Sequence, residues 1–329
     1  MIKAVNRELA VSIKFISEFE VRNNLNPKSV LDCIKNVFVD YAKGKAAMPS
    51  KVYLEMNTPG DDYRAMPAYT RNTAGIKWIA DYTSNIDRNI STTDALIILN
   101  NKHTGKPLSL IEGNFITQAR TAATTALATQ AILNGDKVKK IAFIGCGAQT
   151  MPHLQFLLEV VDVKEISFYD KNIDKAYTMA KSLGDVFEKV YVAQSVQECV
   201  KDSRIITTLT PSRTGYLTNK MLTKPVHINA VGADAVGKRE LCDDIFFNCS
   251  TLVYDDKEQA CHSGDTQYKK GPSHMHTNPH LKEYELKNVL RWSKKTLKEK
   301  IKKSLTVYDS TGLAIEDIAI AEAIYEKIK

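Results

Sequence analysis

The sequence lacks several features that would each assign it to a special class of protein. It has no apolar run near the roughly 20 residues that span a membrane, and no internal repeat or low-complexity tract. Its six cysteines form no Cys-x-x-Cys pair, and isolated thiols in a chain of 329 residues are typical of a reducing compartment. The first residues also lack the apolar block of a signal peptide. We therefore expect a cytoplasmic globular protein with no membrane partner.

Excess positive charge is confined to one stretch. The net charge is +7, and residues 266–303 hold eleven Lys or Arg against three Glu. Nucleic-acid-binding proteins concentrate charge in this way, but no nucleic-acid motif accompanies the stretch, so a solvated lysine-rich face is the favoured interpretation. The same stretch contains His274, His276 and His280 in a loop with prolines. Metal sites need ligands in a preset geometry, so we expect no metal here.

Two kinds of periodicity divide the chain. Apolar residues recur at helical spacing over 26–44, and from about 50 to 112 they alternate with polar residues, which predicts a mostly antiparallel sheet. After a predicted helix at 115–133, strands alternate with helices from 141 to 254. This alternation is typical of a doubly wound parallel sheet covered by helices on both faces.

The end of the chain is predicted to belong to the first unit. Residues 262–304 show no regular pattern, and a strand at 305–308 and one helix close the sequence. Because the irregular stretch separates this strand from the parallel region, we expect it to return to the antiparallel sheet. The predicted fold class is α/β, with a doubly wound domain of residues 116–304 and a discontinuous α+β domain of residues 1–115 plus 305–329.

One turn of the parallel region has the composition of a phosphate-binding loop. The strand Ile141–Ile144 runs into Gly145-Cys146-Gly147 and then into a predicted helix. Gly145 permits the tight turn, and Gly147 lets backbone N–H groups approach a pyrophosphate at the helix N-terminus. The alternative is a turn that uses glycine only for its geometry, since Thr150 stands where the motif has a third glycine. The strand before and the helix after favour a dinucleotide and a Rossmann-type domain.

An acidic residue follows the next predicted strand. Asp170 lies 25 positions after Gly145, near the spacing of ~20 residues at which an acid binds the ribose 2′-hydroxyl. A carboxylate repels a 2′-phosphate at this place, so NAD is favoured as the cofactor. The neighbouring Lys171 leaves NADP open.

Three charged residues lie where a small-molecule dehydrogenase needs them. Lys77 interrupts an apolar strand, Arg120 lies in a small-residue helix, and Asp234 follows the strand Ile228–Val231. Such cations bind carboxylates, and an acid past the end of a parallel strand lies where these sheets bind ligands. The alternatives are an edge lysine with a solvated head, a surface ion pair and a helix-capping aspartate. With the nucleotide site, the three residues describe an amino-acid dehydrogenase.

Eight short blocks, in order along nearly the whole chain, match one known family. They are MPSKVYLE (48–55), RAMPAY (64–69), AGIKWI (74–79), RTAATTALA (120–128), IGCGAQ (144–149), HINAVGAD (227–234), GKREL (237–241) and DSTGLAIED (309–317). Together they resemble the ornithine cyclodeaminase/mu-crystallin family. The resemblance implies a homodimer, a central NAD-binding Rossmann domain, a substrate-binding and dimerisation domain built from the chain ends, and a small amino- or imino-acid substrate.

The resemblance also implies roles for individual residues. Asp234 and Lys77 would be catalytic, with Asp234 as the acid or base at the amine. Arg64 falls where ornithine cyclodeaminases carry a glutamate suited to a side-chain ammonium, and an inward guanidinium would repel that ammonium. The implied substrate-binding residues are Lys51, Arg64, Lys77, Arg120 and Thr311. The implied cofactor-binding residues are Thr92, Arg120, Thr121, Gly145, Gly147, Ala148, Gln149, Asp170, Thr210, Asn229, Val231, Lys238 and Ser310.

Several reactions are open within this resemblance. The shared step is hydride transfer between an amino-acid α-carbon and nicotinamide through an iminium. Attack by a δ-amine then gives cyclodeamination, attack by water gives an alanine dehydrogenase, and the reverse direction gives a ketimine or pyrroline-2-carboxylate reductase or an opine-type enzyme. The blocks RAMPAY and GADA are more similar to alanine dehydrogenases of the family. A ligand-binding protein without turnover, like mu-crystallin, is the alternative from another class.

Overall fold

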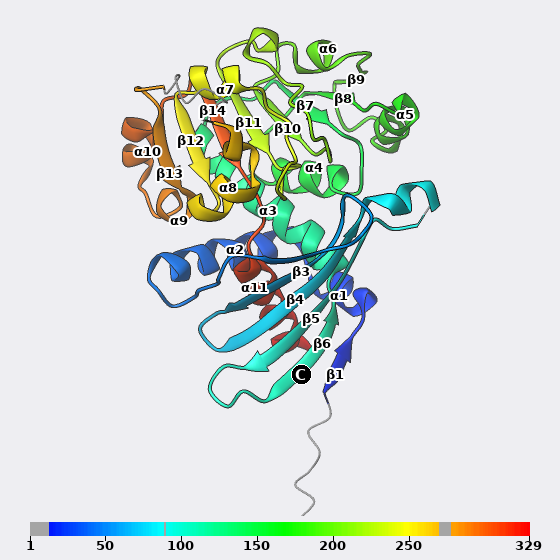
Figure 1. The fold of residues 1–329 in the computed structure, drawn as a ribbon. Helices are drawn as coiled ribbons and strands as arrows, with labels where there is room; N and C mark the ends of the chain where they lie inside the picture. Colours follow the sequence, from blue (N-terminus) through cyan, green and yellow to red (C-terminus); the bar gives the residue numbers. More distant parts are fainter. Residues whose placement is uncertain (1–12, 89, 270–277) are drawn as a thin grey trace, which may run out of the picture.

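The computed structural model describes residues 13–88, 90–269 and 278–329, which form two units, each built on one β-sheet (Figure 1). Among these residues no helix combines the length and the apolar character that a membrane crossing requires. His274 and His276 of the basic stretch lie outside the described residues.

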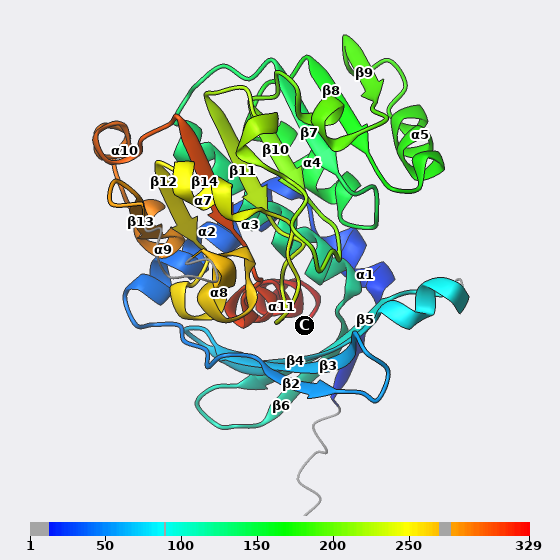
Figure 2. The same ribbon diagram turned by 45° about the horizontal axis from the view of Figure 1, so that its top comes forward.

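The first unit is a six-stranded sheet with helices on one face. Its strands are β1 (Lys14–Ile16), β2 (Val52–Glu55), β3 (Asp61–Tyr69), β4 (Thr73–Tyr82), β5 (Thr93–Asn101) and β6 (Pro107–Glu112); its helices are α1 (Glu18–Asn24), α2 (Pro27–Ala42) and α11 (Ala314–Ile328). The strand order is β1-β6-β5-β4-β3-β2, antiparallel except for the parallel pair of β1 and β6. Helix α11 packs on β3, β4 and β5, and α2 packs on α11 (Figure 2).

The alternation predicted for this unit determines which side chains face the helices. In β4, Lys77 and Ile79 are buried on the helix-covered face, whereas Trp78 is exposed on the opposite face. Strand β4 lies between β3 and β5, so Lys77 is not on an edge, and its side chain is fully buried. The interpretation of Lys77 as an edge lysine with a solvated head is therefore wrong.

The other face of the six-stranded sheet is apolar and uncovered in the monomer. Its exposed residues come from three strands: Val52, Leu54, Trp78, Leu96 and Ile98, with exposed fractions between 40% and 62%. Contiguous exposed apolar surface of this kind marks an interaction site in soluble proteins.

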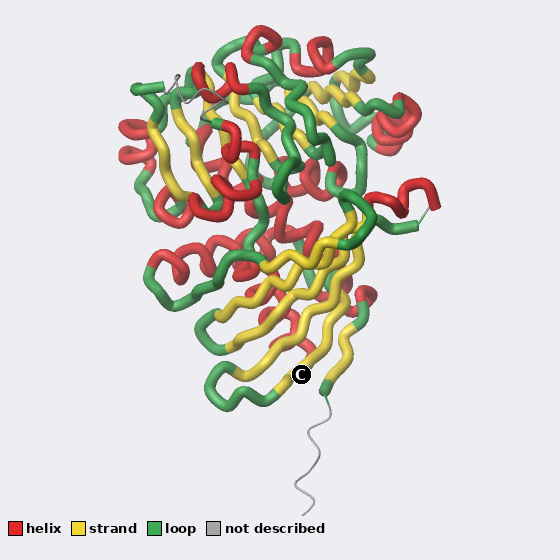
Figure 3. Tube along the Cα trace, in the orientation of Figure 1, coloured by secondary structure: helices red, strands yellow, loops and turns green. Residues whose placement is uncertain are grey.

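The second unit is an eight-stranded parallel sheet. Its strands are β7 (Lys140–Ile144), β8 (Glu165–Tyr169), β9 (Lys189–Val192), β10 (Ile205–Thr208), β11 (Val226–Ala230), β12 (Thr251–Tyr254), β13 (Lys282–Glu285) and β14 (Leu305–Asp309). The strand order is β13-β12-β14-β11-β10-β7-β8-β9, so the direction of winding reverses between β7 and β10. Helices lie in front of and behind this sheet (Figure 3). They are α3 (Asn114–Leu133), α4 (Thr150–Leu158), α5 (Ile173–Ser182), α6 (Val196–Val200), α7 (Asp243–Asn248), α8 (Lys257–Ser263), α9 (Leu286–Val289) and α10 (Lys294–Lys300).

The structure corrects the predicted place of the last strand. Strand β14 pairs in parallel with β11 and β12, so residues 305–309 belong to the eight-stranded sheet and not to the domain of residues 1–115. Only α11 returns to the first unit. All five residues of β14 are buried, as expected for a central strand of a sheet covered on both faces. The prediction relied on the distance of β14 from the parallel region along the chain. The continuous burial of β14 was the better indicator, because it is typical of a central strand in a parallel sheet.

Two smaller predictions also need correction. The stretch 262–304 is not irregular throughout, because it contains α9, α10 and the edge strand β13. Within the strand–helix alternation predicted over 141–254, the helix between β11 and β12 begins only at Asp243, since Leu241 forms a parallel bridge with Leu217 and residues 239–242 are not helical.

The chain passes between the two units at two points, from β6 into α3 and from β14 into α11. Helix α3 lies between the units, because it packs on α2 and β5 in one and on α4, β11 and β14 in the other. One side of α3 therefore faces the first sheet and the other side faces the second sheet. Arg120 lies on this helix.

Candidate active site

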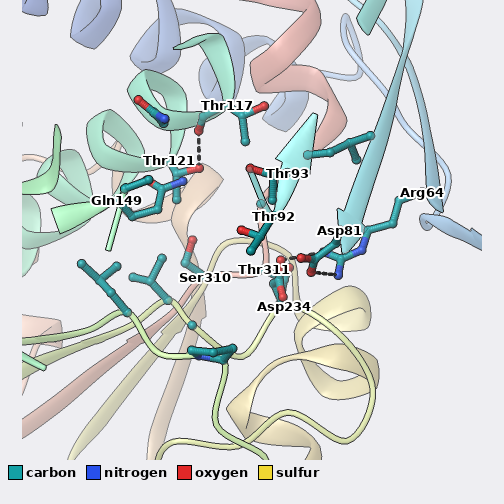
Figure 4. A pocket seen from close by; sticks show the side chains of 18 of the residues that line it. Arg64, Asp81, Thr92, Thr93, Thr117, Thr121, Gln149, Asp234, Ser310 and Thr311 are labelled. Atoms are coloured by element: carbon teal, nitrogen blue, oxygen red, sulfur yellow. Dashed lines mark hydrogen bonds and ion pairs between the residues drawn. The ribbon is translucent and has the colours of Figure 1, made fainter. Parts of the chain in front are cut away.

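A cleft of about 280 Å³ lies between the two units, at the carboxyl ends of the parallel strands (Figure 4). Doubly wound sheets bind ligands at this end, where the strand order reverses. The cleft brings together most of the site residues predicted from the sequence. Those that line it are Lys51, Arg64, Lys77, Thr92, Arg120, Thr121, Gly147, Ala148, Gln149, Thr210, Val231, Asp234, Lys238, Ser310 and Thr311.

The turn between β7 and α4 has the form that a phosphate requires. Gly145 has a φ of +97°, and a Cβ there would lie 2.8 Å from the Leu209 carbonyl oxygen, so a larger residue does not fit. A Cβ on Gly147 would meet nothing within 4 Å, so its backbone faces open space beside the N-terminus of α4. The Oε1 atom of Gln149 at this end is buried, and it has no hydrogen-bond partner in the described part of the chain. Open backbone N–H groups and a free amide oxygen fit a dinucleotide here.

Asp170 follows β8 and lies beside the glycine turn. Its Oδ2 accepts a hydrogen bond from the Cys146 N–H at 2.8 Å, and its Oδ1 accepts one from the Asn172 N–H at 2.8 Å. These bonds hold the carboxylate in place and leave lone pairs on both oxygens for further donors. This placement suits the two hydroxyls of a ribose and disfavours a 2′-phosphate.

Three predicted cofactor residues, Gly145, Asp170 and Asn229, do not line the cleft, and Asn229 lies inside the sheet. Asn229 on β11 accepts a hydrogen bond from Thr129 at 3.1 Å and donates one to Thr207 at 3.3 Å. Its side chain therefore links α3 to two neighbouring strands. Thr210, by contrast, lines the cleft, and its backbone N–H and hydroxyl both donate to Glu240 at 2.7 Å.

Arg64 points into the cleft and contacts Asp234 (Figure 4). Its Nη1 lies 2.6 Å from Asp234 Oδ2, and its other nitrogens lie 2.7 Å from Asp62 and 2.5 Å from Asp81. Lys238 completes the cluster, with its Nζ 2.8 Å from Asp234 Oδ1 and 3.1 Å from Asp81. Lys238, predicted as a cofactor residue, thus binds the predicted catalytic acid.

This cluster determines the charge of Asp234. Burial opposes the charged form, but Arg64, Lys238 and Lys51 outweigh it and hold the pKa of Asp234 well below its usual range. The carboxylate is therefore ionised throughout the neutral range. Because 32% of the side chain is exposed, it remains available to a cation that enters the cleft.

Lys77 and Arg120 each have a buried counter-ion on α11. Lys77 Nζ lies 2.7 Å from Asp317 Oδ2, and both side chains are fully buried. Arg120 Nε lies 3.2 Å from Asp317 Oδ1, and its Nη1 lies 3.2 Å from Glu316 Oε2. Burial lowers the pKa of Lys77 to about 8, although Asp317 opposes this effect. The alternative of a surface ion pair for Arg120 is wrong, because the pair is buried.

Lys51 differs from the other cations of the cleft because it has no carboxylate partner among the described residues. Its Nζ donates to the backbone carbonyl oxygen of Thr311 and, at 3.5 Å, to that of Asp234. Burial lowers the pKa of Lys51 to about 7, although the charge of Asp234 opposes the shift. A half-buried cation without a counter-ion is a place where an incoming carboxylate gains most.

Apart from Asp234, the acidic partners of these cations were not predicted from the sequence. The alternation of side chains along the strands could have revealed two of them, since Asp81 shares the face of Lys77 in β4 and Asp62 is two residues from Arg64 in β3. The other two, Glu316 and Asp317, lie in the block DSTGLAIED, where no local pattern shows that a carboxylate is turned inward.

A doubly wound domain with an open glycine turn, facing a cleft rich in cations, defines a dinucleotide-dependent oxidoreductase of small acids. The family model described as "Ornithine cyclodeaminase/mu-crystallin family" matches residues 12–329. The chain therefore belongs to this family, as the ordered sequence blocks predicted.

Relatives confirm the fold and the enzyme class. The chain is 35% identical over 315 residues to the alanine dehydrogenase of Archaeoglobus fulgidus, with 94% of each chain covered. A solved archaeal alanine dehydrogenase dimer with bound NAD has a TM-score of 0.84 and 31% identity, and 95% of each chain is covered. The Δ1-pyrroline-2-carboxylate reductase of Thermococcus litoralis, solved with NADH and L-proline, has a TM-score of 0.85 and 27% identity over 95% of this chain and 96% of that one. The predicted oxidoreductase of the C–N bond with a Rossmann-type fold is thereby confirmed.

Proposed function

We propose that the protein interconverts a small L-amino acid and its imine by NAD-dependent hydride transfer at the α-carbon, with L-alanine as the preferred substrate. The observation that carries this proposal is Arg64, 2.6 Å from Asp234 inside the cleft. A guanidinium there repels the second ammonium of a diamino acid, and Asp62 and Asp81 are already engaged by Arg64. The cleft therefore favours a short, uncharged side chain over ornithine or lysine.

In this proposal the cations of the cleft hold the carboxylate of the substrate. Lys51 supplies the charge that has no counter-ion, while Lys77 and Arg120 supply donors from β4 and α3. Thr311, whose carbonyl oxygen accepts from Lys51, lies beside the same position. Fixing the carboxylate leaves only a small rotation for the α-carbon, which raises the fraction of bound substrate in a reactive orientation.

Asp234 receives the amine of the substrate in this proposal. The ionised carboxylate attracts the ammonium, which must lose a proton before the nitrogen lone pair can assist hydride departure. Because its pKa is held low by Arg64 and Lys238, Asp234 passes that proton on to solvent through its exposed side and does not retain it.

The residues at the glycine turn fit NAD. Gly145, Gly147 and Gln149 would hold the pyrophosphate and Asp170 the ribose hydroxyls, and the bound cofactor supplies the hydride acceptor. The fixed carboxylate of Asp170 supports NAD over NADP. The other residues that we assign to cofactor binding and that line the cleft are Thr92, Arg120, Thr121, Ala148, Thr210, Val231, Lys238 and Ser310.

A spectrophotometric assay tests the proposal. The purified protein is incubated with NAD or NADP and each of L-alanine, L-ornithine and L-proline, and reduced cofactor is followed by its absorbance. We expect reduction of NAD with L-alanine, weaker reduction of NADP, and no release of proline and ammonia from L-ornithine. Turnover of L-ornithine at a higher kcat/KM than L-alanine would overturn the argument from Arg64.

The likeness to the Thermococcus litoralis reductase supports a second candidate. That enzyme was solved with NADH and L-proline in a fold with a TM-score of 0.85 to this chain, so reduction of Δ1-pyrroline-2-carboxylate in the same cleft is the alternative reaction. NADH oxidation with this imine, compared by kcat/KM with NAD reduction by L-alanine, decides between them. Retention of either compound without any turnover would favour a mu-crystallin-like binding protein.

We also infer a cytoplasmic homodimer that associates through the outer face of the six-stranded sheet. The support is the exposed apolar surface around Trp78 and Leu96, together with the dimeric state named for the solved archaeal relative. The first sheet with α11 would then form the substrate-binding and dimerisation domain, and α3 with the parallel sheet the NAD-binding domain. Light scattering at micromolar concentration measures the mass of the assembly.

A further inference from the structure

We propose that Asp317 is a positioning residue that holds Lys77 and Arg120 together as one carboxylate-binding clamp. This inference rests on the proposed function, because it concerns how the two cations meet the substrate. Asp317 lies in the first turn of α11, on the side of that helix turned toward the cleft-lining residues of α3 and β4.

The geometry assigns one oxygen of Asp317 to each cation. Oδ2 lies 2.7 Å from Lys77 Nζ and Oδ1 lies 3.2 Å from Arg120 Nε. Lys77 comes from a strand of the first unit and Arg120 from the helix between the units, so no backbone ladder sets the distance between their charged ends. The bridging carboxylate sets it, and it lies fully buried where water does not compete for the same donors.

The segment that precedes Asp317 contacts the clamp as well. The Thr311 carbonyl oxygen accepts a hydrogen bond from Lys51. Gly312 has a φ of +78°, and a Cβ there would lie 2.2 Å from Arg120 Nη1, so the guanidinium lies directly against this backbone. Residues 311–317 are also the second connection between the units, which ties the clamp to the sheet that carries the cofactor turn.

Removing the charge of Asp317 has a defined consequence. The charged groups that face Lys77 are Asp317 and Glu316 from α11 and Arg120 from α3. Without Asp317, two buried cations lie next to each other with Glu316 as their remaining partner, so they move apart or Lys77 loses its proton. Either response separates the two donors that a substrate carboxylate must reach together.

Asp317→Asn, an isosteric change, tests the proposal in the full-length protein. We expect the KM for L-alanine to rise at least about tenfold, as for one misplaced charge-assisted hydrogen bond, while kcat changes less and the Kd of NADH, measured by its fluorescence, rises by a smaller factor, because Arg120 is only one of the residues assigned to the cofactor. Glu322→Gln is the matched control on the same helix, because Glu322 accepts hydrogen bonds from Thr70 at 2.6 Å and Thr73 at 3.0 Å outside the cleft. An equal KM in Asp317→Asn and the control overturns the proposal.

A second variant covers the case in which Asp317→Asn does not fold. Asp317→Glu keeps the charge balance and moves the carboxylate by one methylene, so a KM raised by a larger factor than the Kd of NADH supports a positioning role and an unchanged KM overturns it.

Propionate binding, measured by calorimetry, separates this inference from the proposed function, since it requires the clamp and no turnover. Loss of propionate binding in Asp317→Asn supports the clamp even if the wild type converts no amino acid. Unchanged binding in an active enzyme overturns the clamp alone.

Discussion

We predict that the affinity of the cleft for a carboxylate depends on pH, because Lys51 gains and loses its proton near neutral pH. Its pKa is lowered to about 7 because desolvation disfavours its charge and, among the described residues, it contacts backbone carbonyl oxygens and no carboxylate. Only the charged form pairs with an incoming carboxylate, and the new ion pair raises the pKa of Lys51, so binding takes up a proton. Below pH 7 Lys51 is already charged and the affinity is level. Above pH 7 the affinity falls about tenfold per pH unit, since one pKa unit is about 1.4 kcal/mol.

The size of the expected fall in affinity follows from the titration of Lys51. Between pH 6 and pH 8.5, a group with a pKa of about 7 goes from mostly charged to about 3% charged, so the affinity should fall about 30-fold, or about 2 kcal/mol. Propionate is the suitable ligand, because its carboxylate is ionised over the whole range and it has no amine. Calorimetry in two buffers of different ionisation enthalpy measures both the affinity and the proton taken up.

Lys51→Arg is the decisive comparison, because a guanidinium stays charged at every pH of the assay. In this variant the fall in affinity should shrink to a few-fold, because Lys77, whose pKa is about 8, also loses part of its charge by pH 8.5. Glu316 titrates in the same window, since burial raises its pKa to about 7 against the effect of Arg120, and its ionisation also weakens an anion at Arg120. Glu316→Gln removes that contribution. A 30-fold fall that persists in Lys51→Arg would refute the reasoning.

Three further predictions test other parts of the site. Asp234→Asn should lower kcat by about 10²- to 10⁴-fold, the usual contribution of a general acid or base, with NADH fluorescence titration showing unchanged cofactor affinity; equal turnover would remove Asp234 from the chemistry. Gly145→Ala should lower the melting temperature and weaken NAD binding, because φ is +97° and the added Cβ meets the Leu209 carbonyl oxygen at 2.8 Å; a variant that melts and binds like the wild type would show that the turn relaxes freely. Trp78→Glu should halve the mass seen by light scattering, because it places a charge in the proposed apolar interface; an unchanged mass would move the interface elsewhere.

Local sequence patterns were sufficient to predict most of the helices and strands. Asn26 accepts a hydrogen bond from the Ser29 N–H at 2.9 Å and caps α2, at the start of the range 26–44 where apolar residues recur at helical spacing. Alternation in β4 correctly placed Lys77 and Trp78 on opposite faces. The glycine turn has the predicted strand before it and helix after it. Each of these patterns involves residues that are only a few positions apart, so the sequence alone is enough to recognise it.

Prediction from the sequence failed where a strand or a charged side chain pairs with a residue from a distant part of the chain. Strand β14 was assigned to the wrong sheet because its hydrogen-bonding partners, β11 and β12, are decided by packing and not by order in the chain. Lys77 was left open between a solvated and a binding role, since its counter-ion Asp317 lies 240 positions further along the sequence. The direction of Arg64 was equally undecided until Asp62, Asp81 and Asp234 were seen around it.

The sequence by itself determined the class of this protein, because the periodicities, the glycine turn and the ordered blocks are written in contiguous residues. The tertiary structure alone decided the electrostatics of the cleft: four of its cations have carboxylate partners from other segments, and Lys51 has none among the residues described. The physical reason is that charge–charge energies depend on distance and burial in the folded state, and neither quantity is encoded by position in the chain.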